Sequence, residues 1–484
     1  MDKQNFQSIG RRLRCCCFLF SIWGLLTLGA CSDDKSDSSI AYDPSQPVTI
    51  TDFEPKEGAM CTDMFITGNN FGTDISKIEV KIGDKAIKVV GSNGKKIYCV
   101  IPQKSGSGPV SVTVYDNDMN PTTTTFEEDF TYKPKVLVST VARNVDEYGK
   151  YSIVDGDLSV AGFDTPGPLR FNKEDGSLWV TELGNSIRRI DLEKKTVSTV
   201  ISESQASFSK MQSFDFSFDY DTLFMVDDNT DSKAPNRVVI AYSLRSQNYR
   251  AAYPYAKGMC GYDIAINPLD NTKYYNTYRN GAVLKLFGKN EGTGQDEYLD
   301  GYYAHQKMFF MNAFFSGNVG ITYLNIHPEG KYMLVCIKDK HLIIKSMYDP
   351  VKQIFMPATL FCGTANKSGY TDGTGTGALF NSPRQGVFVK NEAYVKAGKD
   401  DVYDFYVCDG KNHCIRKITP EGVVSLVAGR GSRNVNSSYW GYIDGDPIED
   451  ARFDTPTGIA YDESTQTFYI GEENNHDIRM LGIQ

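Results

Sequence analysis

A pattern that occurs three times constrains the fold of this chain most strongly. Each copy has an Asp-Gly turn, then Ala-x-Phe, then a Pro three residues after the Phe, and then several short strand-like runs. The copies begin at Asp155-Gly156, Asp372-Gly373 and Asp444-Gly445. Recurrence of so long a pattern indicates a repeat architecture in which each copy forms one supersecondary unit.

Short strand-like runs recur in sets of four along residues 134–484. The first set reads GPLRF, SLWVTE, SIRRID and TVSTVI, and further sets begin near residues 212, 261, 320, 385 and 457. Such four-stranded units predict a β-propeller. The last set ends after three strands, whereas the isolated run 135–144 has the character of a fourth strand. We therefore predict an all-β chain whose six-bladed propeller, over 134–484, is closed by pairing of 135–144 with the C-terminal blade.

The propeller signature is carried by the turn between the second and third strands of a blade. Asn412-His413-x-Ile415-Arg416 and Asn475-His476-x-Ile478-Arg479 share it, and Asn185-Ser186-Ile187-Arg188 is a weaker version. Together with the Asp-Gly and Ala-x-Phe-x-x-Pro elements, these residues resemble the NHL-repeat family. The resemblance covers the first, fifth and sixth blades, while the middle three share only the strand rhythm.

Residues 47–133 alternate strand-like runs with Gly, Asn and Asp turns, which predicts an antiparallel β-sandwich. The motifs Phe53-x-Pro55-x-x-Gly58 and Phe65-Ile66-x-Gly68-x-Asn70-Phe71-Gly72 resemble the IPT/TIG domain, which has an immunoglobulin-like fold. The resemblance implies a spacer between the membrane and the propeller. Glycan binding at the tip of the sandwich is the alternative.

The N-terminus has the pattern of a lipoprotein signal peptide over residues 1–30. A basic segment precedes the apolar run 15–28, which is too short to span a bilayer comfortably, and Leu28-Gly29-Ala30-Cys31 ends it. This ending resembles the bacterial lipoprotein box, which implies lipidation of Cys31. The acidic tether at 31–46 is similar to the export signal of Bacteroidetes surface lipoproteins. We therefore expect a lipid anchor in the outer membrane, with the protein exposed at the cell surface.

Seven cysteines remain after the signal peptide and Cys31 are set aside. Cys408 with Cys414 and Cys61 with Cys99 are candidate disulfide pairs, because an extracellular location permits disulfides. The alternative is that these side chains are small buried hydrophobes. No Cys or His spacing is typical of zinc, so we predict no metal and no cofactor.

The sequence gives no recognisable catalytic constellation. His413 and His476 share the signature position, where a role in blade packing is expected. The other three histidines do not recur at one position on several blades, as a central metal site would require. A Gly-x-Ser-x-Gly elbow and a phosphate-binding Gly loop are also missing from the sequence. We therefore expect a protein that is not an enzyme.

Long loops between blades predict a binding surface. In a propeller, the loops that join blades and the turns between second and third strands gather on one face. Aromatic rings there can stack on sugars, and polar side chains can bond to hydroxyls. The candidate ligand-binding residues on these segments are Tyr439, Trp440, Tyr442, Arg430, Tyr370, Asn185, Asp227, Arg279, Asp409, Asn412, Glu472 and Asn474. Two alternatives stay open: the aromatic residues seal the loop against the blade, and the polar residues are solvated hairpin tips.

The whole architecture resembles surface lipoproteins of Bacteroidetes polysaccharide-utilisation systems. This resemblance implies an extracellular polysaccharide or oligosaccharide as ligand, and a TonB-dependent transporter with a SusD-like lipoprotein as partners. The net charge of −9 argues against nucleic acid. The alternatives are a propeller-type hydrolase or lyase that acts on a polysaccharide, and a protein-interaction scaffold at the cell surface.

Overall fold

The computed structural model describes residues 41–59, 62–102, 105–228, 237–257, 260–277, 281–286, 305–314 and 317–484. The predicted signal peptide, Cys31, Cys61 and Arg279 lie outside these residues. The chain divides into two compact units. One contains residues up to Pro55, Asp63–Val100 and Pro109–Asp129, and the other contains Lys56–Thr62, Ile101–Gly108 and Phe130–Gln484. Both units are built from β-strands, which confirms the predicted fold class of a β-sandwich followed by a six-bladed propeller.

The sandwich strands follow the order β1(Thr49–Glu54), β3(Asp63–Asn69), β6(Lys96–Val100), β5(Lys85–Ser92), β4(Ile78–Ile82), β7(Gly108–Tyr115), β8(Pro121–Tyr132), β2(Glu57–Gly58). The pairs from β1 to β7 in this order are antiparallel, whereas β2 pairs with β8 in parallel. Alternation sets the core: in β7, Val110, Val112 and Val114 are buried, while the residues between them face outward.

The six blades each contain at least four antiparallel strands. Blade 1 has β11(Pro166–Asn172), β12(Ser177–Glu182), β13(Ser186–Asp191) and β14(Thr196–Ser202), with β10(Gly156–Asp157) outside it. Blade 2 has β15(Met211–Phe216), β16(Thr222–Asp227), β17(Val238–Leu244) and β18(Tyr253–Lys257). Blade 3 has β19(Gly261–Ile266), β20(Lys273–Thr277), β21(Ala282–Leu286) and β22(His305–Phe310).

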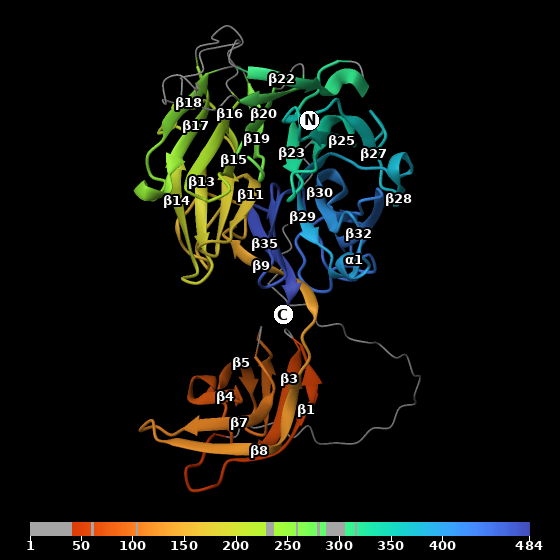
Figure 1. Ribbon diagram of the computed structural model, residues 1–484. Helices are drawn as coiled ribbons and strands as arrows, with labels where there is room; N and C mark the ends of the chain where they lie inside the picture. Colours follow the sequence, from red (N-terminus) through yellow and green to blue (C-terminus); the bar gives the residue numbers. More distant parts are fainter. Residues whose placement is uncertain are drawn as a thin grey trace, which may run out of the picture. The chain divides into compact units, whose positions relative to one another are not determined.

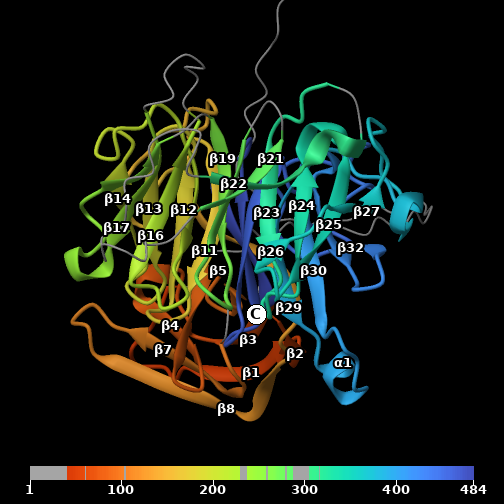
Figure 2. The same ribbon diagram turned by 45° about the horizontal axis from the view of Figure 1, so that its top comes forward.

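Blades 4 to 6 follow the same plan (Figure 2). Blade 4 has β23(Thr322–Ile326), β24(Tyr332–Ile337), β25(Leu342–Asp349) and β27(Thr359–Gly363), and β26(Ile354–Phe355) also pairs with β25. Blade 5 has β29(Pro383–Lys390), β30(Tyr403–Asp409), β31(Cys414–Ile418) and β32(Val423–Gly429), with β28(Gly373–Thr374) outside them and α1(Glu392–Lys396) after β29. Blade 6 has β33(Pro456–Asp462), β34(Thr467–Glu472) and β35(Asp477–Ile483).

The ring closes between the two ends of the propeller sequence. β9(Val136–Arg143) pairs with β35 in antiparallel fashion from Val136 opposite Ile483 to Arg143 opposite Asp477 (Figure 1). Backbone bonds between Lys135 and Gln484 extend the pairing in both directions, at 3.1 and 2.8 Å. The predicted closure and blade count are therefore confirmed.

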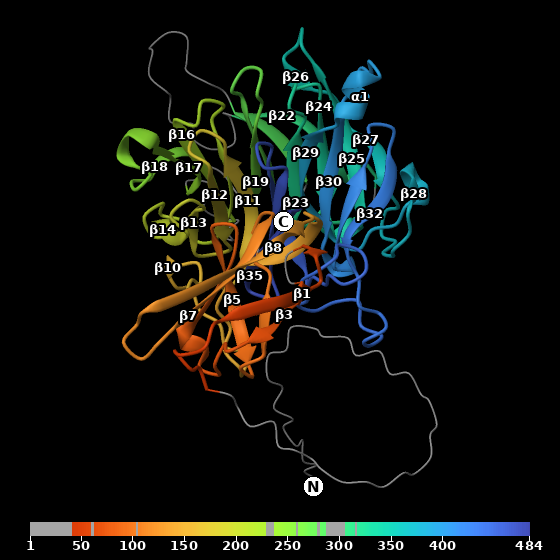
Figure 3. The same ribbon diagram turned by 90° about the horizontal axis from the view of Figure 1, so that it is seen from below.

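The first strands of successive blades pack against one another around the centre of the ring, where Figure 3 labels β11, β19, β23 and β29. These inner strands are edge strands whose N–H groups lack a ladder partner on one side. Side chains of the preceding blade accept several of them: Asp215 from Ile266, Asp263 from Leu324 at 2.7 Å, Asn325 from Gly386, and Gln385 from Ile459. Polar residues on these strands thus join neighbouring blades.

A buried arginine explains the repeated sequence pattern. Arg188, Arg416 and Arg479 occupy equivalent positions in the third strands of blades 1, 5 and 6, and each is fully buried. In blade 5 the Arg416 guanidinium bonds to Asp409 at the end of β30 and to Asp372 of the Asp-Gly turn. It also donates to the carbonyls of Thr371 and Leu379, which face each other in an isolated bridge.

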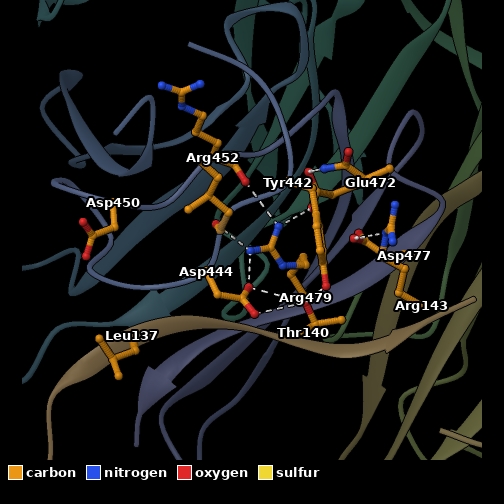
Figure 4. Close-up of polar contacts among 12 residues, drawn as sticks. Leu137, Thr140, Arg143, Tyr442, Asp444, Asp450, Arg452, Glu472, Asp477 and Arg479 are labelled. Carbon is orange, nitrogen blue, oxygen red and sulfur yellow. Dashed lines mark hydrogen bonds and ion pairs between the residues drawn. The ribbon is translucent and has the colours of Figure 1, made fainter. Parts of the chain in front are cut away.

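The same bonds recur in the other two blades. Arg188 forms ion pairs with Glu182 and Asp155. Arg479 forms ion pairs with Glu472 and Asp444 (Figure 4). The Phe of each Ala-x-Phe element packs beneath the guanidinium, at 4.6 to 5.4 Å from ring centroid to Cζ. The Asp-Gly turn, the Phe and the Ile-Arg pair are therefore parts of one strap that holds the inter-blade loop onto the blade.

Cys408 and Cys414 flank the turn between β30 and β31, but both carry free thiols and are fully buried. Of the two sequence interpretations, the structure supports the buried hydrophobe for this pair. Separately, no helix among the described residues has the length and the apolar character needed to cross a membrane.

Candidate ligand site on the propeller

Four of the predicted residues converge between blades 5 and 6. The Arg430 guanidinium lies 3.9 Å from the ring centroid of Tyr370 and 4.3 Å from that of Tyr439, so the cation is held between two aromatic faces. Trp440 packs edge-on against Tyr439, with centroids 5.2 Å apart, and 46% of its surface is exposed. We name Tyr370, Arg430, Tyr439 and Trp440 the aromatic–arginine cluster.

The backbone fixes Arg430 in this position. Arg430 directly follows β32 and adopts a left-handed conformation with φ of 68°, which is uncommon for a residue with a side chain. Its Nη1 donates to the carbonyl of Asn412 at 2.9 Å. Strained conformations of this kind persist where the surrounding structure over-determines them, as at ligand sites.

A cavity of about 520 Å³ lies beside the cluster. Tyr370 and Arg430 line it together with polar and charged residues of the inter-blade loop 430–455. Its remaining lining residues are Leu426, Gly429, Gly431, Ser432, Arg433, Asn434, Ile448, Glu449 and Asp450. The wall offers both cations and carboxylates beside flat aromatic surface, which suits a neutral, hydroxyl-rich ligand better than a ligand of one charge.

The dipeptide Asn412-His413 contacts the aromatic–arginine cluster and the loops that carry it. Asn412 donates to the carbonyl of Gly369 at 2.8 Å and thereby holds the inter-blade loop of its own blade. The next residue, His413, accepts from the N–H of Thr455 of blade 6 at 3.2 Å through Nδ1. Its ring lies 5.9 Å from Trp440 and 5.6 Å from Tyr439. The signature dipeptide therefore joins two successive inter-blade loops.

A third histidine, His341, shares the position of the signature residues His413 and His476, which the sequence did not indicate. His341, His413 and His476 occupy equivalent turns between the second and third strands of blades 4, 5 and 6, each with positive φ. Each ring contacts the segment just before the next inner strand: Ser382 N–H, Thr455 N–H and the Asp164 carbonyl. The recurrence was hidden because His341 lacks the Asn and the Ile-Arg pair. These rings link blades and do not converge on the channel.

Tyr442 lies apart from the cluster. It contacts Arg143 at 4.3 Å and Arg479 at 5.0 Å, and its hydroxyl is 2.7 Å from that of Thr140 in β9 (Figure 4). These contacts fit the sealing alternative for this residue, since they fasten the last inter-blade loop onto the closing strand.

Asp227, Asp409 and Glu472 share a different role. Each ends the second strand of its blade, is almost fully buried, and accepts backbone N–H groups of the segment that leads into the same blade. Burial raises the pKa of Asp227 and of Asp409 to about 6, and raises that of Glu472 well above its usual value. This geometry places them, with the equally buried Asn412, in blade packing and outside any exposed surface.

Asn185 and Asn474 are exposed at hairpin tips, in line with the solvated-tip alternative. Asn474 also donates to Asp454 and Thr455, at 3.0 and 2.9 Å. Arg279 lies outside the described residues.

The channel mouth at the opposite end of the blades holds a second cavity, of about 260 Å³. Arg170 and Asp215 form an ion pair of 3.0 Å in its wall, next to Gln385. Sequence reasoning missed these residues. The sequence marks each of them only as a polar residue within an otherwise apolar strand. Within the described part of the chain, no group of three or more His, Cys, Asp or Glu side chains is placed to hold a metal ion.

Known proteins match both parts of the chain. The IPT/TIG domain family matches residues 47–128. An auxiliary nutrient-binding protein from Bacteroides thetaiotaomicron shares 33% identity and a TM-score of 0.66, with 92% of this chain and 99% of that protein covered. A protein from the same organism described as a putative phosphatase shares 30% identity and a TM-score of 0.68, with 92% and 98% covered.

A further auxiliary nutrient-binding protein, from Bacteroides ovatus, shares 27% identity and a TM-score of 0.64, with 92% of this chain and 100% of that protein covered. No curated protein sequence matches the chain. The similarity to these Bacteroides structures extends over the sandwich and the propeller together, because it covers nearly the whole of each.

Proposed function

Because the chain belongs to the family of the Bacteroides thetaiotaomicron auxiliary nutrient-binding protein, we propose that it captures an extracellular nutrient, and that this nutrient is a glycan. The propeller is the binding module, and the IPT/TIG domain is a spacer. The protein binds without chemical conversion of its ligand.

The aromatic–arginine cluster carries this proposal. Trp440 offers an exposed ring, and the polar cavity beside Tyr370 and Arg430 offers hydroxyl, amide, guanidinium and carboxylate groups. Sugar rings present apolar faces that stack on aromatic side chains and hydroxyls that bond to such polar groups. Tyr439 and Arg430 hold one another in place, so binding would order few additional groups.

Calorimetry with the chain from residue 41 onward tests the proposal against a panel of plant, host and bacterial polysaccharides. We expect at least one polysaccharide to bind, and Trp440→Ala to weaken that binding about tenfold, because one stacking contact is lost. Phe218→Ala is the matched control. Phe218 is 68% exposed in the turn between β15 and β16, at the other end of the blades. A panel without any binding polysaccharide would refute the proposal, and equal affinity of Trp440→Ala and wild type would refute the site.

The location proposed for this activity is the outer membrane, with lipid on Cys31 and the protein exposed at the surface. Delivery to a TonB-dependent transporter and a SusD-like lipoprotein completes the proposal. Cys31→Ser should move the protein out of the membrane fraction and abolish its labelling by radioactive palmitate. Unchanged membrane association of that variant would contradict the anchor.

Phosphate-ester hydrolysis is a second candidate, and the relative described as a putative phosphatase is the observation that favours it. Release of p-nitrophenol from p-nitrophenyl phosphate, with and without added divalent cations, distinguishes the two. Turnover that survives Trp440→Ala would favour this candidate over glycan capture.

A further inference from the structure

The arrangement at Trp440 recurs one blade further along the ring. Tyr151, in the inter-blade loop 144–165, stacks on His476 with ring centroids 3.4 Å apart and planes 16° from parallel. Tyr151 is 41% exposed and the nearby Tyr148 is 87% exposed. None of these three residues is part of the aromatic–arginine cluster.

Tyr151 and Trp440 are equivalent in the repeat. Each stands four residues before the Asp of its Asp-Gly turn, Asp155 or Asp444. Each contacts the signature histidine of the preceding blade, which is His476 for Tyr151 and His413 for Trp440. The propeller therefore presents two aromatic platforms at successive blade junctions. Both lie on the end of the blades where the inter-blade loops and the turns between second and third strands meet.

A direct polar link joins the two platforms. Asn475 donates from Nδ2 to the carbonyl of Gly441 at 2.9 Å. Gly441 directly follows Trp440, and Asn475 directly precedes His476, on which Tyr151 stacks. A single hydrogen bond thus links the two chain segments that carry the platforms, so the position of one platform constrains the position of the other.

Local hydrogen bonds hold the loop that carries Tyr151. The Asp146 carboxylate accepts from the N–H of Tyr148 at 2.9 Å and from that of Lys150 at 2.8 Å. Tyr151 forms an isolated β-bridge with Val145. Aromatic rings that are held by such contacts lose little conformational freedom on binding, which favours affinity.

We propose that Tyr151 and Tyr148 form a second sugar subsite, which holds further rings of the same glycan that binds at the aromatic–arginine cluster. This inference rests on the proposed function and specifies its ligand: the site takes an oligosaccharide that crosses blade 6, and it discriminates by chain length. Tyr151 offers an exposed ring for the apolar face of a sugar, and the exposed side chains of Tyr148 and Lys150 in the same loop carry hydroxyl and ammonium groups that can bond to sugar hydroxyls.

The test is calorimetry with malto-, cello-, laminari-, xylo- and manno-oligosaccharides of two to six rings. For the series that binds, we expect affinity to rise with length. We expect Tyr151→Ala to weaken the longest member about tenfold and to leave the shortest unchanged. Trp440→Ala should weaken both. Tyr151→Phe should behave as wild type, since the stacking ring is kept.

Tyr148→Ala provides a variant with little risk to folding, because the side chain is almost fully exposed. It should show the same length-dependent loss as Tyr151→Ala, with an unchanged melting temperature. If Trp440→Ala weakens binding but neither tyrosine variant affects any length, the second subsite is refuted and the proposed function stands. If no member of any series binds to wild type and the polysaccharide panel is also negative, both are refuted.

Discussion

The carboxyls of Glu472 and Asp477 lie together in blade 6 with no exposure to solvent, beside Arg479 (Figure 4). Burial raises the pKa of Asp477 to about 6, and burial together with the Asp477 charge raises the pKa of Glu472. A raised folded-state pKa means that protonation favours the folded state. This stabilisation is complete below about pH 4, the ordinary pKa of a carboxyl, and is lost as the pH rises through about 6.

Asp477→Asn should therefore raise the free energy of unfolding at pH 7.5 by about 1–3 kcal/mol, because a buried charge is removed. At pH 4.5 the variant and wild type should be nearly equal. Urea denaturation at both pH values measures the difference. Glu463→Gln, at an exposed carboxyl in the turn after β33, is the control and should change neither value. A gain of the same size at both pH values would contradict the assignment.

Single residues also show where sequence reasoning ends. The residues of the aromatic–arginine cluster could be found from the sequence, because Tyr, Trp and Arg in a loop rich in Ser, Asn and Gly indicate an exposed surface. The burial of Asp409 and Glu472 could not be predicted, because an acidic residue beside a turn has the same sequence context whether its side chain points to solvent or into the blade. The register of the preceding strand decides this, and the strand boundary is uncertain by a residue or more from sequence alone.

The strap between the third strand and the inter-blade loop is the element on which the repeat pattern depends. Arg416 satisfies Asp409 and Asp372 together with two backbone carbonyls. Removal of one partner from a buried ion pair leaves the other charge without compensation. Replacement of both partners with apolar residues avoids that cost.

Arg416→Ala should lower the free energy of unfolding by about 3–5 kcal/mol, and Arg416→Met combined with Asp409→Leu should recover much of the loss. The matched control is Arg189→Ala, because Arg189 pairs with Asp175 at the surface of blade 1 with a third of each side chain exposed. The control should change stability by no more than about 1 kcal/mol. Chemical denaturation followed by circular dichroism gives all three values. Equal losses in the single and double variants would show that the ion pair is not the determinant.

The strap explains which elements the sequence could predict. The Asp-Gly turn, the Phe and the Ile-Arg pair recur together because they touch one another, so blades 1, 5 and 6 were recognisable. Blades 2 to 4 kept only the alternation of their strands. In these blades the links between inner strands, such as Asp263 to Leu324, leave no periodic sequence signal.

At the scale of the whole molecule, the six-fold ring was predictable because the sequence ends one strand short. A propeller has to bury the edges of its first and last sheets, and a strand from the other terminus does this in the last blade. The face that we propose to bind ligand was not predictable from the sequence to the same degree. Both ends of the blades carry exposed aromatic residues, and only the contacts of Trp440 and Tyr151 with the signature histidines distinguish them.

Closure through β9 makes a direct prediction about stability. Val138 of β9 is 1% exposed and pairs with Leu481. It also exchanges backbone hydrogen bonds with Gly445 of the last inter-blade loop, at 2.9 and 3.0 Å. Val136, two residues earlier on the same strand, is 50% exposed. Val138→Asp buries a charge without a partner and weakens the pairing of β9 with β35, so it should lower the free energy of unfolding by more than about 3 kcal/mol. Val136→Asp should cost less than about 1 kcal/mol, because its carboxylate stays in water. Urea denaturation compares the two, and hydrogen exchange should show β35 opening first in Val138→Asp. Equal stability of the two variants would mean that the ring holds without this strand.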